Sequence, residues 1–244
     1  MNSVRSYVLL LRWQYLRYRP LLPLLAGIQV ALGVGVIFGF SFLVPHLTST
    51  VVLYFATGAP TLSLILMGLT ALPQEVAQNR STGKFTYVAA LPVPRLAPMF
   101  ADVTFWMLIQ LPGAVVTLLL ANLRFGLHLN ISGLVVPAVI LVALTASAVG
   151  YAIAVALPPN ATSQVSSFVS IALLLFSPIN FPLDRLPVWL QDVHRALPVT
   201  YMSDIMRGGL TGRYDVSRWL AFAVVAAWCA LGLTVSGRAA RHRG

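Results

Sequence analysis

The residues that could carry out chemistry are few in this chain of 244 residues. It has six acidic residues, four histidines and one cysteine, Cys229, which lies inside an apolar run. The sequence contains no Gly-x-x-x-x-Gly-Lys-Ser/Thr loop for nucleotide phosphates. Its acids and histidines are too scattered for a zinc site, a catalytic triad or a carboxylate pair. We therefore expect no catalytic, metal or cofactor site in this chain, and a single cysteine excludes a disulfide framework.

Two weaker chemical signals lie within apolar stretches. An acid inside a membrane span usually marks function, but Asp102 stands near the start of its stretch, where headgroups or Arg95 can pair with it, so we favour an interfacial role. Four hydroxyls recur on one helical face further along: Ser163, Ser166, Ser167 and Ser170. They fit the lining of a solute path, although such hydroxyls more often bond a neighbouring helix or their own backbone.

The composition places these residues in a membrane. The chain is 58% hydrophobic and 9% charged, with a mean hydropathy of +0.84, whereas soluble domains are about 25% charged. Its net charge is +10, and most arginines flank apolar runs, which fits membrane topology and anionic lipids rather than nucleic acid. We expect an all-α membrane protein with one membrane domain over residues 1–244.

Six apolar stretches predict six transmembrane helices: about 21–44, 50–72, 98–122, 133–157, 162–177 and 217–236. A short break at 45–49 separates the first two. Four small residues fall four apart in the first stretch, and we interpret this stripe as packing against another helix of the chain: Gly27, Ala31, Gly35 and Gly39. Gly58 and Pro60 predict a kink in the second stretch.

Residues 2–19 predict an amphipathic helix that lies in the membrane surface. Arg5, Arg12 and Arg19 stand seven apart on one side of it. Apolar and aromatic residues recur at helical spacing on another: Val4, Tyr7, Val8, Leu11, Tyr15 and Tyr18. The alternative is a basic tail that only sets the orientation of the first span.

The stretch 176–210 is too polar to cross a bilayer and too apolar for an ordinary loop. Each of its four prolines fixes φ and removes a backbone donor, so no long helix can pass through it. Irregular backbone at membrane depth must be covered by protein or water, so we expect short broken helices over 178–213, before the last span.

These motifs also carry a family resemblance. Ser-Pro, Phe-Pro, Leu-Pro-x-Trp-Leu and Leu-Pro-x-Thr-Tyr, followed by an arginine, resemble the last extracellular segment of type-2 ATP-binding-cassette (ABC) exporter permeases. The resemblance implies that this segment gates the outer mouth. The gate residues it implies are Ser177, Pro178, Phe181, Pro182, Leu186, Pro187, Trp189, Leu197, Pro198, Tyr201 and Arg207.

Residues 73–97 resemble the cytoplasmic loop of the same family. A glutamate, an arginine and a glycine precede an apolar turn and a Pro-x-x-Arg end, although Lys84-Phe85-Thr86 stands where the family usually has a Thr-Leu-Glu-like step. The resemblance implies a coupling helix that docks into an ATPase subunit. The residues concerned are Glu75, Arg80, Gly83, Phe85, Pro92 and Arg95. The alternative is a basic cytoplasmic loop that only follows the positive-inside rule and docks nothing.

The basic residues favour an orientation with both termini in the cytoplasm, because most of them lie in the segments this arrangement puts inside. We expect a location in a bacterial inner membrane. The resemblance implies two permease chains, identical or paired with a sister chain, and two ATPase subunits that hold ATP and Mg²⁺.

The expected function is export of drugs, antibiotics or other amphiphilic molecules, since aliphatic, aromatic and hydroxyl side chains would line the path. Export of lipid-linked polysaccharide or lipid is the second reading, and a membrane assembly subunit that transports nothing is the third. An ion-coupled transporter would need buried acids, and only Asp102 could serve.

Overall fold

The computed structural model describes residues 3–43, 49–126 and 129–242, and every regular element in these ranges is helical. Three short helical elements are not α-helical: the 3-10 helices η1 (Arg19–Leu21) and η3 (Leu183–Arg185) and the π-helix η2 (Met67–Ala71). The α-helices are α1 (Ser3–Tyr18), α2 (Leu22–Leu43), α3 (Ser49–Leu66), α4 (Leu72–Ser81), α5 (Lys84–Ala89), α6 (Ala97–Phe125), α7 (Val135–Ala156), α8 (Pro159–Phe176), α9 (Val188–Ala196), α10 (Pro198–Thr211) and α11 (Arg218–His242).

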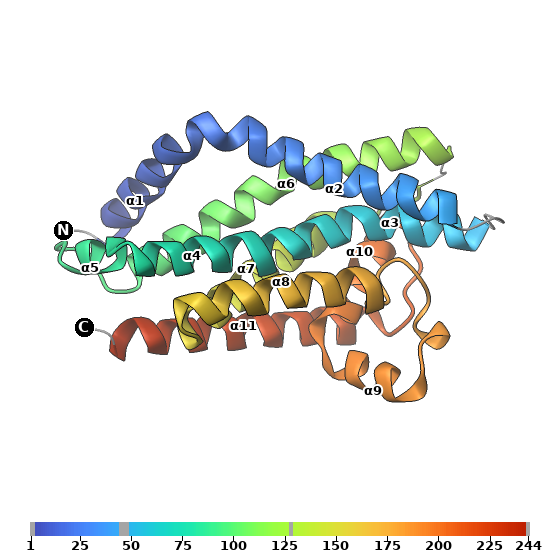
Figure 1. Ribbon diagram of the computed structural model, residues 1–244. Helices are drawn as coiled ribbons and strands as arrows, with labels where there is room; N and C mark the ends of the chain where they lie inside the picture. The colour runs from blue at the N-terminus through green and yellow to red at the C-terminus, as the bar shows by residue number, and fades with distance from the viewer. Residues whose placement is uncertain (1–2, 44–48, 127–128, 243–244) are drawn as a thin grey trace.

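The long helices run side by side along one axis (Figure 1). Both chain ends lie at one end of this bundle together with α5, and we call it the terminal end. The helices α9 and α10 lie at the opposite end, which we call the distal end. The predicted coupling loop and the predicted gate therefore occupy opposite ends of the molecule.

Five helical segments of the described chain are long and apolar enough to cross a membrane: Val4–Gly39, Val51–Ser81, Ala97–Phe125, Val135–Ala156 and Arg218–Ala239. The stretch predicted at 162–177 forms α8, which has only 18 residues and begins with polar ones, and it is not among the five. In Figure 1, α8 nevertheless runs along the bundle beside the other long helices. The connection predicted at 45–49 lies outside the described residues except for Ser49.

The structure shows which face of α1 packs against the rest of the chain. Ser6, Leu10, Gln14 and Tyr18, spaced four apart, are buried, whereas three members of the predicted apolar face, Val4, Val8 and Tyr15, are exposed. The prediction of a surface helix did not specify which residues face the other helices of the chain. The buried face packs against α6, where Gln14 donates to Asp102.

The small-residue stripe of α2 also faces away from the rest of the chain, so the predicted packing within the chain is wrong. A β-carbon at Gly27, Gly35 or Gly39 would meet no atom within 4 Å. Gly33, off the stripe, is the close approach instead: a β-carbon there would lie 2.3 Å from the Thr117 Oγ1 of α6. The spacing predicted a helix face of small residues, but it did not predict which part of the protein packs against that face.

The second span is a longer rod than predicted. The helix α3 continues through Pro60, η2 follows as a π-helical turn, and α4 carries the rod on to Ser81. Leu72, Val76 and Ala77 are buried, so the first third of the predicted loop 73–97 belongs to the bundle. Pro73 stands in the first turn of α4, where the missing backbone donor is tolerated.

The core divides along the axis. Towards the distal end, apolar side chains of α3, α7 and α10 pack together, including Leu62, Val142 and Met202. Towards the terminal end, Tyr18 packs against Phe105 and Trp106, with ring centroids 5.3 and 5.8 Å apart. A buried hydrogen bond also joins α6 to α7: Gln110 donates to the Ala143 carbonyl at 2.9 Å.

Candidate functional site

The distal end is closed by α10, a short helix buried between α3, α7 and α11. Pro198 begins it and Gly212, at φ +74°, ends it in the left-handed conformation that favours glycine. Its apolar face enters the core with Met202, Ile205 and Leu210. The backbone N–H of Ser132 donates to the Gly209 carbonyl at 2.9 Å, which ties α10 to the segment before α7.

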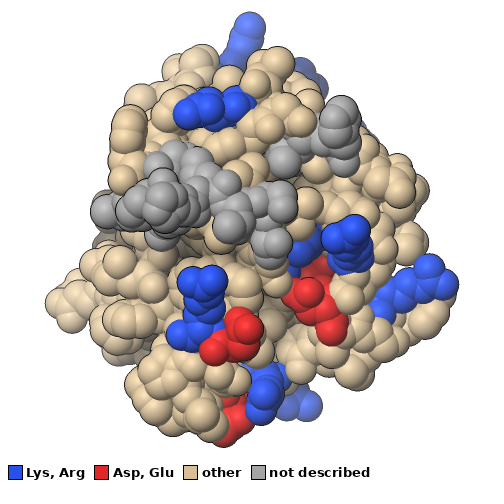
Figure 2. All heavy atoms as spheres, turned by 90° about the vertical axis from the view of Figure 1, so that its right-hand side faces the viewer, with Lys and Arg blue, Asp and Glu red and all other residues tan. Residues whose placement is uncertain are grey.

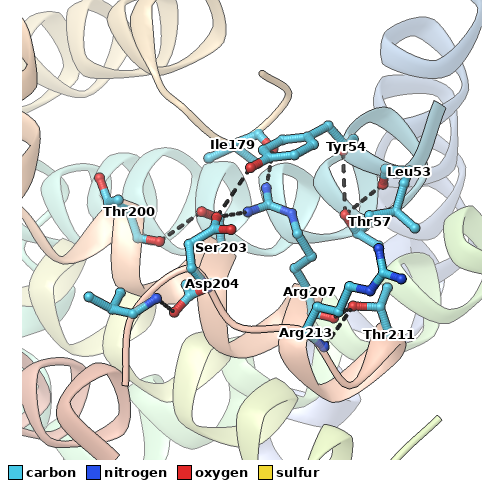
Figure 3. Close-up of polar contacts among 12 residues, drawn as sticks. Leu53, Tyr54, Thr57, Ile179, Thr200, Ser203, Asp204, Arg207, Thr211 and Arg213 are labelled. Atoms are coloured by element: carbon cyan, nitrogen blue, oxygen red, sulfur yellow. Dashed lines mark hydrogen bonds and ion pairs between the residues drawn. The ribbon is translucent and has the colours of Figure 1, made fainter. Parts of the chain in front are cut away.

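Arg207 of α10 is the centre of a polar cluster on this helix (Figure 3). Its side chain is 4% exposed, and Nη1 donates to Asp215 Oδ2 at 2.9 Å while Nη2 donates to the Ile179 carbonyl at 3.1 Å. The guanidinium also stacks 3.7 Å from the ring centroid of Tyr54 in α3. The planar fork of arginine makes all of these contacts at once, so one side chain joins α3, α10 and the segment after α8.

Two further members complete this cluster. The Tyr54 hydroxyl donates to Asp215 Oδ2 at 3.2 Å. Asp204, 2% exposed, accepts from the backbone N–H of Asp215 at 2.6 Å and holds the turn that leads into α11. Burial raises the pKa of Asp204, while the backbone N–H bonds from Asp215 and Val216 act to lower it. We call Tyr54, Asp204, Arg207 and Asp215 the distal cluster.

Charges of both signs gather on the distal face, where acidic side chains lie directly beside basic ones (Figure 2). Much of the remaining surface in this view is uncharged. The mixed surface agrees with the sequence, which puts four of the six acids between 184 and 215. This face is not a uniformly basic one.

The predicted gate residues do not form one surface. Ser177, Pro198 and Arg207 are buried, while Pro187 and Trp189 are exposed. The Leu186 carbonyl accepts from Gln191 at 2.8 Å, and the Tyr201 hydroxyl donates to the Arg195 carbonyl at 3.0 Å. The other predicted members, Pro178, Phe181, Pro182 and Leu197, lie in the connections between α8, α9 and α10.

The helix α9 is held by His194, which is 5% exposed. Its ring lies near the Phe176 carbonyl at the end of α8, and its backbone carbonyl accepts from Thr200 Oγ1 at 3.0 Å. Burial lowers the pKa of His194, and the Phe176 carbonyl only partly opposes this. The neutral imidazole therefore fastens α9 to α8.

At the terminal end, Arg80 of α4 caps a neighbouring helix. Its Nη1 donates to the Ala154 and Leu157 carbonyls at 2.5 and 2.6 Å, at the last turn of α7. A cation is favourable there because the carbonyls at the end of a helix lack intrahelical partners and carry its negative partial charge. The predicted coupling residue Arg80 thus joins α4 rigidly to α7.

Two side chains of α1 bind it to this region. Arg17 Nη1 lies 3.3 Å from Glu75 Oε1 and donates to Asn79 Oδ1 at 3.3 Å, both in α4. Gln14 Nε2 donates to Asp102 Oδ1 of α6. Asp102 therefore has a partner in α1, which the sequence reading did not anticipate when it named headgroups or Arg95.

The remaining predicted coupling residues surround these contacts. Gly83, at φ +75°, makes the turn between α4 and α5. Phe85 packs against the core of the terminal end, and Pro92 and Arg95 lie in the connection from α5 to α6. Lys84, which replaces the family's usual residue type, lies 4.6 Å from the Trp13 ring centroid of α1. Burial lowers the pKa of Lys84, and the Arg17 charge adds to this.

The four predicted path serines separate into two pairs. Ser163 and Ser167 are exposed, and Ser167 Oγ donates to the Ser163 carbonyl at 3.0 Å. Ser170 Oγ donates to the Ser166 carbonyl at 2.7 Å and is hydrogen-bonded to Thr70 of η2. These hydrogen bonds to the helix's own backbone and to a neighbouring helix are the alternative to a path lining that the sequence left open.

Sequence reasoning missed several of these partners. Tyr54, Gln14 and Asn79 carry no signal beyond being polar residues within or beside apolar helices. Asp204 does carry one, because it stands three residues before the predicted gate residue Arg207 in the same helix, a spacing that places both on one face.

The comparison with known families covers both ends of the molecule. A family model described as ABC-2 type transporter matches residues 6–211, from α1 through α10. A search of curated proteins found no match. The matched segment is more than half of the chain, and it confirms the resemblance that the two polar segments carry. The chain therefore belongs to the ABC-2 type transporter family and is a membrane-spanning permease subunit of an ABC transporter.

Proposed function

We propose that this chain is the permease of an ATP-driven exporter of drugs or other amphiphilic molecules, with α8 as a sixth span and α1 as an interfacial helix. Both termini and α5 then face the cytoplasm, and α9 and α10 lie outside. Two such chains, or one with a sister permease, work with two ATPase subunits that bind ATP and Mg²⁺.

The joint at the terminal end carries this proposal. Arg80 fixes α4 to the end of α7, and Arg17 fixes α1 to the same turn of α4. An ATPase subunit that pushes on α5 and the adjoining loop would therefore move α1, α4 and α7 together. Rigid connections of this kind are what a mechanical link needs.

The distal cluster serves as the outer gate in this proposal. It closes the bundle through contacts between α3, α10 and the segment after α8, so moving α3 relative to α10 would break them together. The exposed face of α8, with Phe168, Ile171 and Ser167, then forms the path with the second permease chain. An apolar path dotted with hydroxyls fits amphiphilic cargo.

A pull-down of the tagged chain from native membranes in mild detergent, with ATP hydrolysis measured on the eluate, tests the proposal. We expect an ATPase subunit at about equal amounts, with activity that falls in Glu75→Arg or Arg80→Gln variants. Arg12→Gln, exposed on α1, is the matched control. Retrieval of the chain without any ATPase would favour the assembly-subunit reading.

A further inference from the structure

Two adjoining cavities at the terminal end differ in chemistry. The first has a volume of about 240 Å³ and is bounded by α1, α4, α5, α6, α7 and α11. The second, of about 330 Å³, lies between α1 and residues 87–93. They share part of their walls: Leu10, Trp13, Val88 and Val93. One space therefore continues into the other along α1.

The first cavity carries charges of both signs. Asp102 lines it from α6, Lys84 from α5 and Arg95 from the connection between them, with the amides of Gln14 and Asn79 beside them. Asp102 accepts a hydrogen bond from the neutral Gln14 amide, and Lys84 lies over the Trp13 ring. Asp102 and Lys84 also act on one another electrostatically, so the cavity offers one anionic and one cationic side chain.

The second cavity is almost wholly apolar. Apart from Ser6, its wall consists of aliphatic and aromatic side chains and one proline. A water molecule occupies about 30 Å³ in the liquid, so each cavity has room for a group far larger than water. A charged space joined to an apolar one matches a molecule with a polar head and a hydrocarbon tail.

We propose that these cavities bind one aminophospholipid, with its head, a phosphate ester bearing a primary ammonium, in the first cavity and part of an acyl chain in the second. The ammonium would donate to the Asp102 carboxylate, and the phosphate would accept from Lys84. A zwitterionic head can pair its ammonium with Asp102 and its phosphate with Lys84 at the same time. A purely anionic lipid would leave Asp102 opposed by like charge, and a choline head has no N–H to donate.

Such a site would bear on the motion of the permease, because α1, α5 and α6 line it together. Bound lipid would stabilise the relative positions of these helices. The site itself depends only on the cavities and their residues, and so it can be present whether or not the exporter proposal is correct.

Native mass spectrometry of the purified, delipidated full chain tests the site. We add phosphatidylethanolamine, phosphatidylcholine or phosphatidylglycerol micelles at matched concentrations and compare the lipid-bound fractions. We expect at least about tenfold tighter retention of phosphatidylethanolamine. Asp102→Asn should abolish this preference, and Lys84→Gln, on the short helix α5, should weaken binding of the phosphate-bearing head without depending on the packing of α6.

Asp192→Asn, exposed on α9, is the matched control and should retain the preference. Equal retention of the three lipids, or a preference unchanged in both Asp102→Asn and Lys84→Gln, would overturn the proposal. Soluble phosphoethanolamine distinguishes the source of the head. Weak competition supports a lipid, whereas binding as tight as that of the lipid would show that the apolar cavity holds no acyl chain.

Discussion

Gly150 of α7 packs directly against the carbonyl oxygen of Gly68, which would lie 2.0 Å from a β-carbon at position 150. Gly68 belongs to the π-helical turn η2, and a β-carbon there would lie 2.6 Å from that of Ala146. The rod formed by α3 and α4 therefore touches α7 backbone to backbone. Small residues allow this approach, which is how membrane helices gain close packing.

The first prediction concerns this contact. Gly150→Ala should lower the free energy of unfolding by about 1–3 kcal/mol or more, because its β-carbon meets backbone rather than a flexible side chain. Thermal unfolding of the detergent-purified chain, followed by circular dichroism, measures this. The effect should appear whether or not an ATPase is present.

Gly35→Ala is the matched control, since a β-carbon there would meet nothing within 4 Å. Alanine is favoured over glycine in a helix interior by about 1 kcal/mol, so Gly35→Ala should leave the stability unchanged or raise it. A loss as large as that of Gly150→Ala would mean that the outward stripe of α2 packs against another chain in the purified state.

A second prediction separates the roles of charge and shape at Arg207. Arg207→Lys keeps the charge but cannot reach Asp215, the Ile179 carbonyl and the Tyr54 ring together. We expect destabilisation of about 2–4 kcal/mol and faster proteolysis of the connection 177–187. Arg213→Lys, exposed just beyond α10, should behave as the parent chain. Unchanged proteolysis in Arg207→Lys would contradict a closing role for the cluster.

A third prediction concerns Arg17 and Glu75, whose atoms lie 3.3 Å apart. Both side chains are partly exposed, so the pair contributes little to stability, on the order of 0–1 kcal/mol. Its role in coupling should be larger. Arg17→Glu and Glu75→Arg should each reduce ATP-driven transport in reconstituted vesicles, and the double variant should restore part of it. Additive losses in the double variant would exclude a direct link.

The sequence predicted the helical class and the two polar segments well because composition and proline placement act locally. Four prolines close together keep a long helix from forming over 178–198, and the short helices α9 and α10 fall there, whereas the single Pro60 lies within α3. The family motifs in 73–97 and 176–210 likewise depend on residue order alone, and the match over 6–211 confirms the family that they indicate.

The faces of the helices could not be predicted in the same way. In water the apolar face of a helix turns toward the protein core. Lipid is as apolar as a protein core, so in a membrane an apolar face can point either to lipid or to another helix. This explains why α1 buries Ser6 and Gln14 while Val4 and Val8 stay exposed. The glycine stripe of α2 faces outward for the same reason: the spacing of small residues shows that they share a face but not whether that face packs on another helix.

The last prediction is a pH dependence centred on His194. Because burial lowers its pKa, the folded chain holds His194 neutral, whereas the unfolded chain gains a proton near pH 6.5. The stabilising effect of the neutral ring is complete above that pH and is lost as the pH falls below it, because the unfolded state then binds more protons. The melting temperature of the purified chain should therefore fall between pH 7 and pH 5.

His194→Gln isolates this effect. Glutamine retains an N–H donor for the Phe176 carbonyl but does not titrate, and the other histidines and the acids are the same in both proteins. Asp204 acts in the opposite direction, since a raised pKa favours the folded state as the pH falls, and the comparison cancels its contribution. The melting temperature of the parent chain should fall further than that of the variant over this range. Parallel curves would show that His194 does not fasten α9 as a neutral ring.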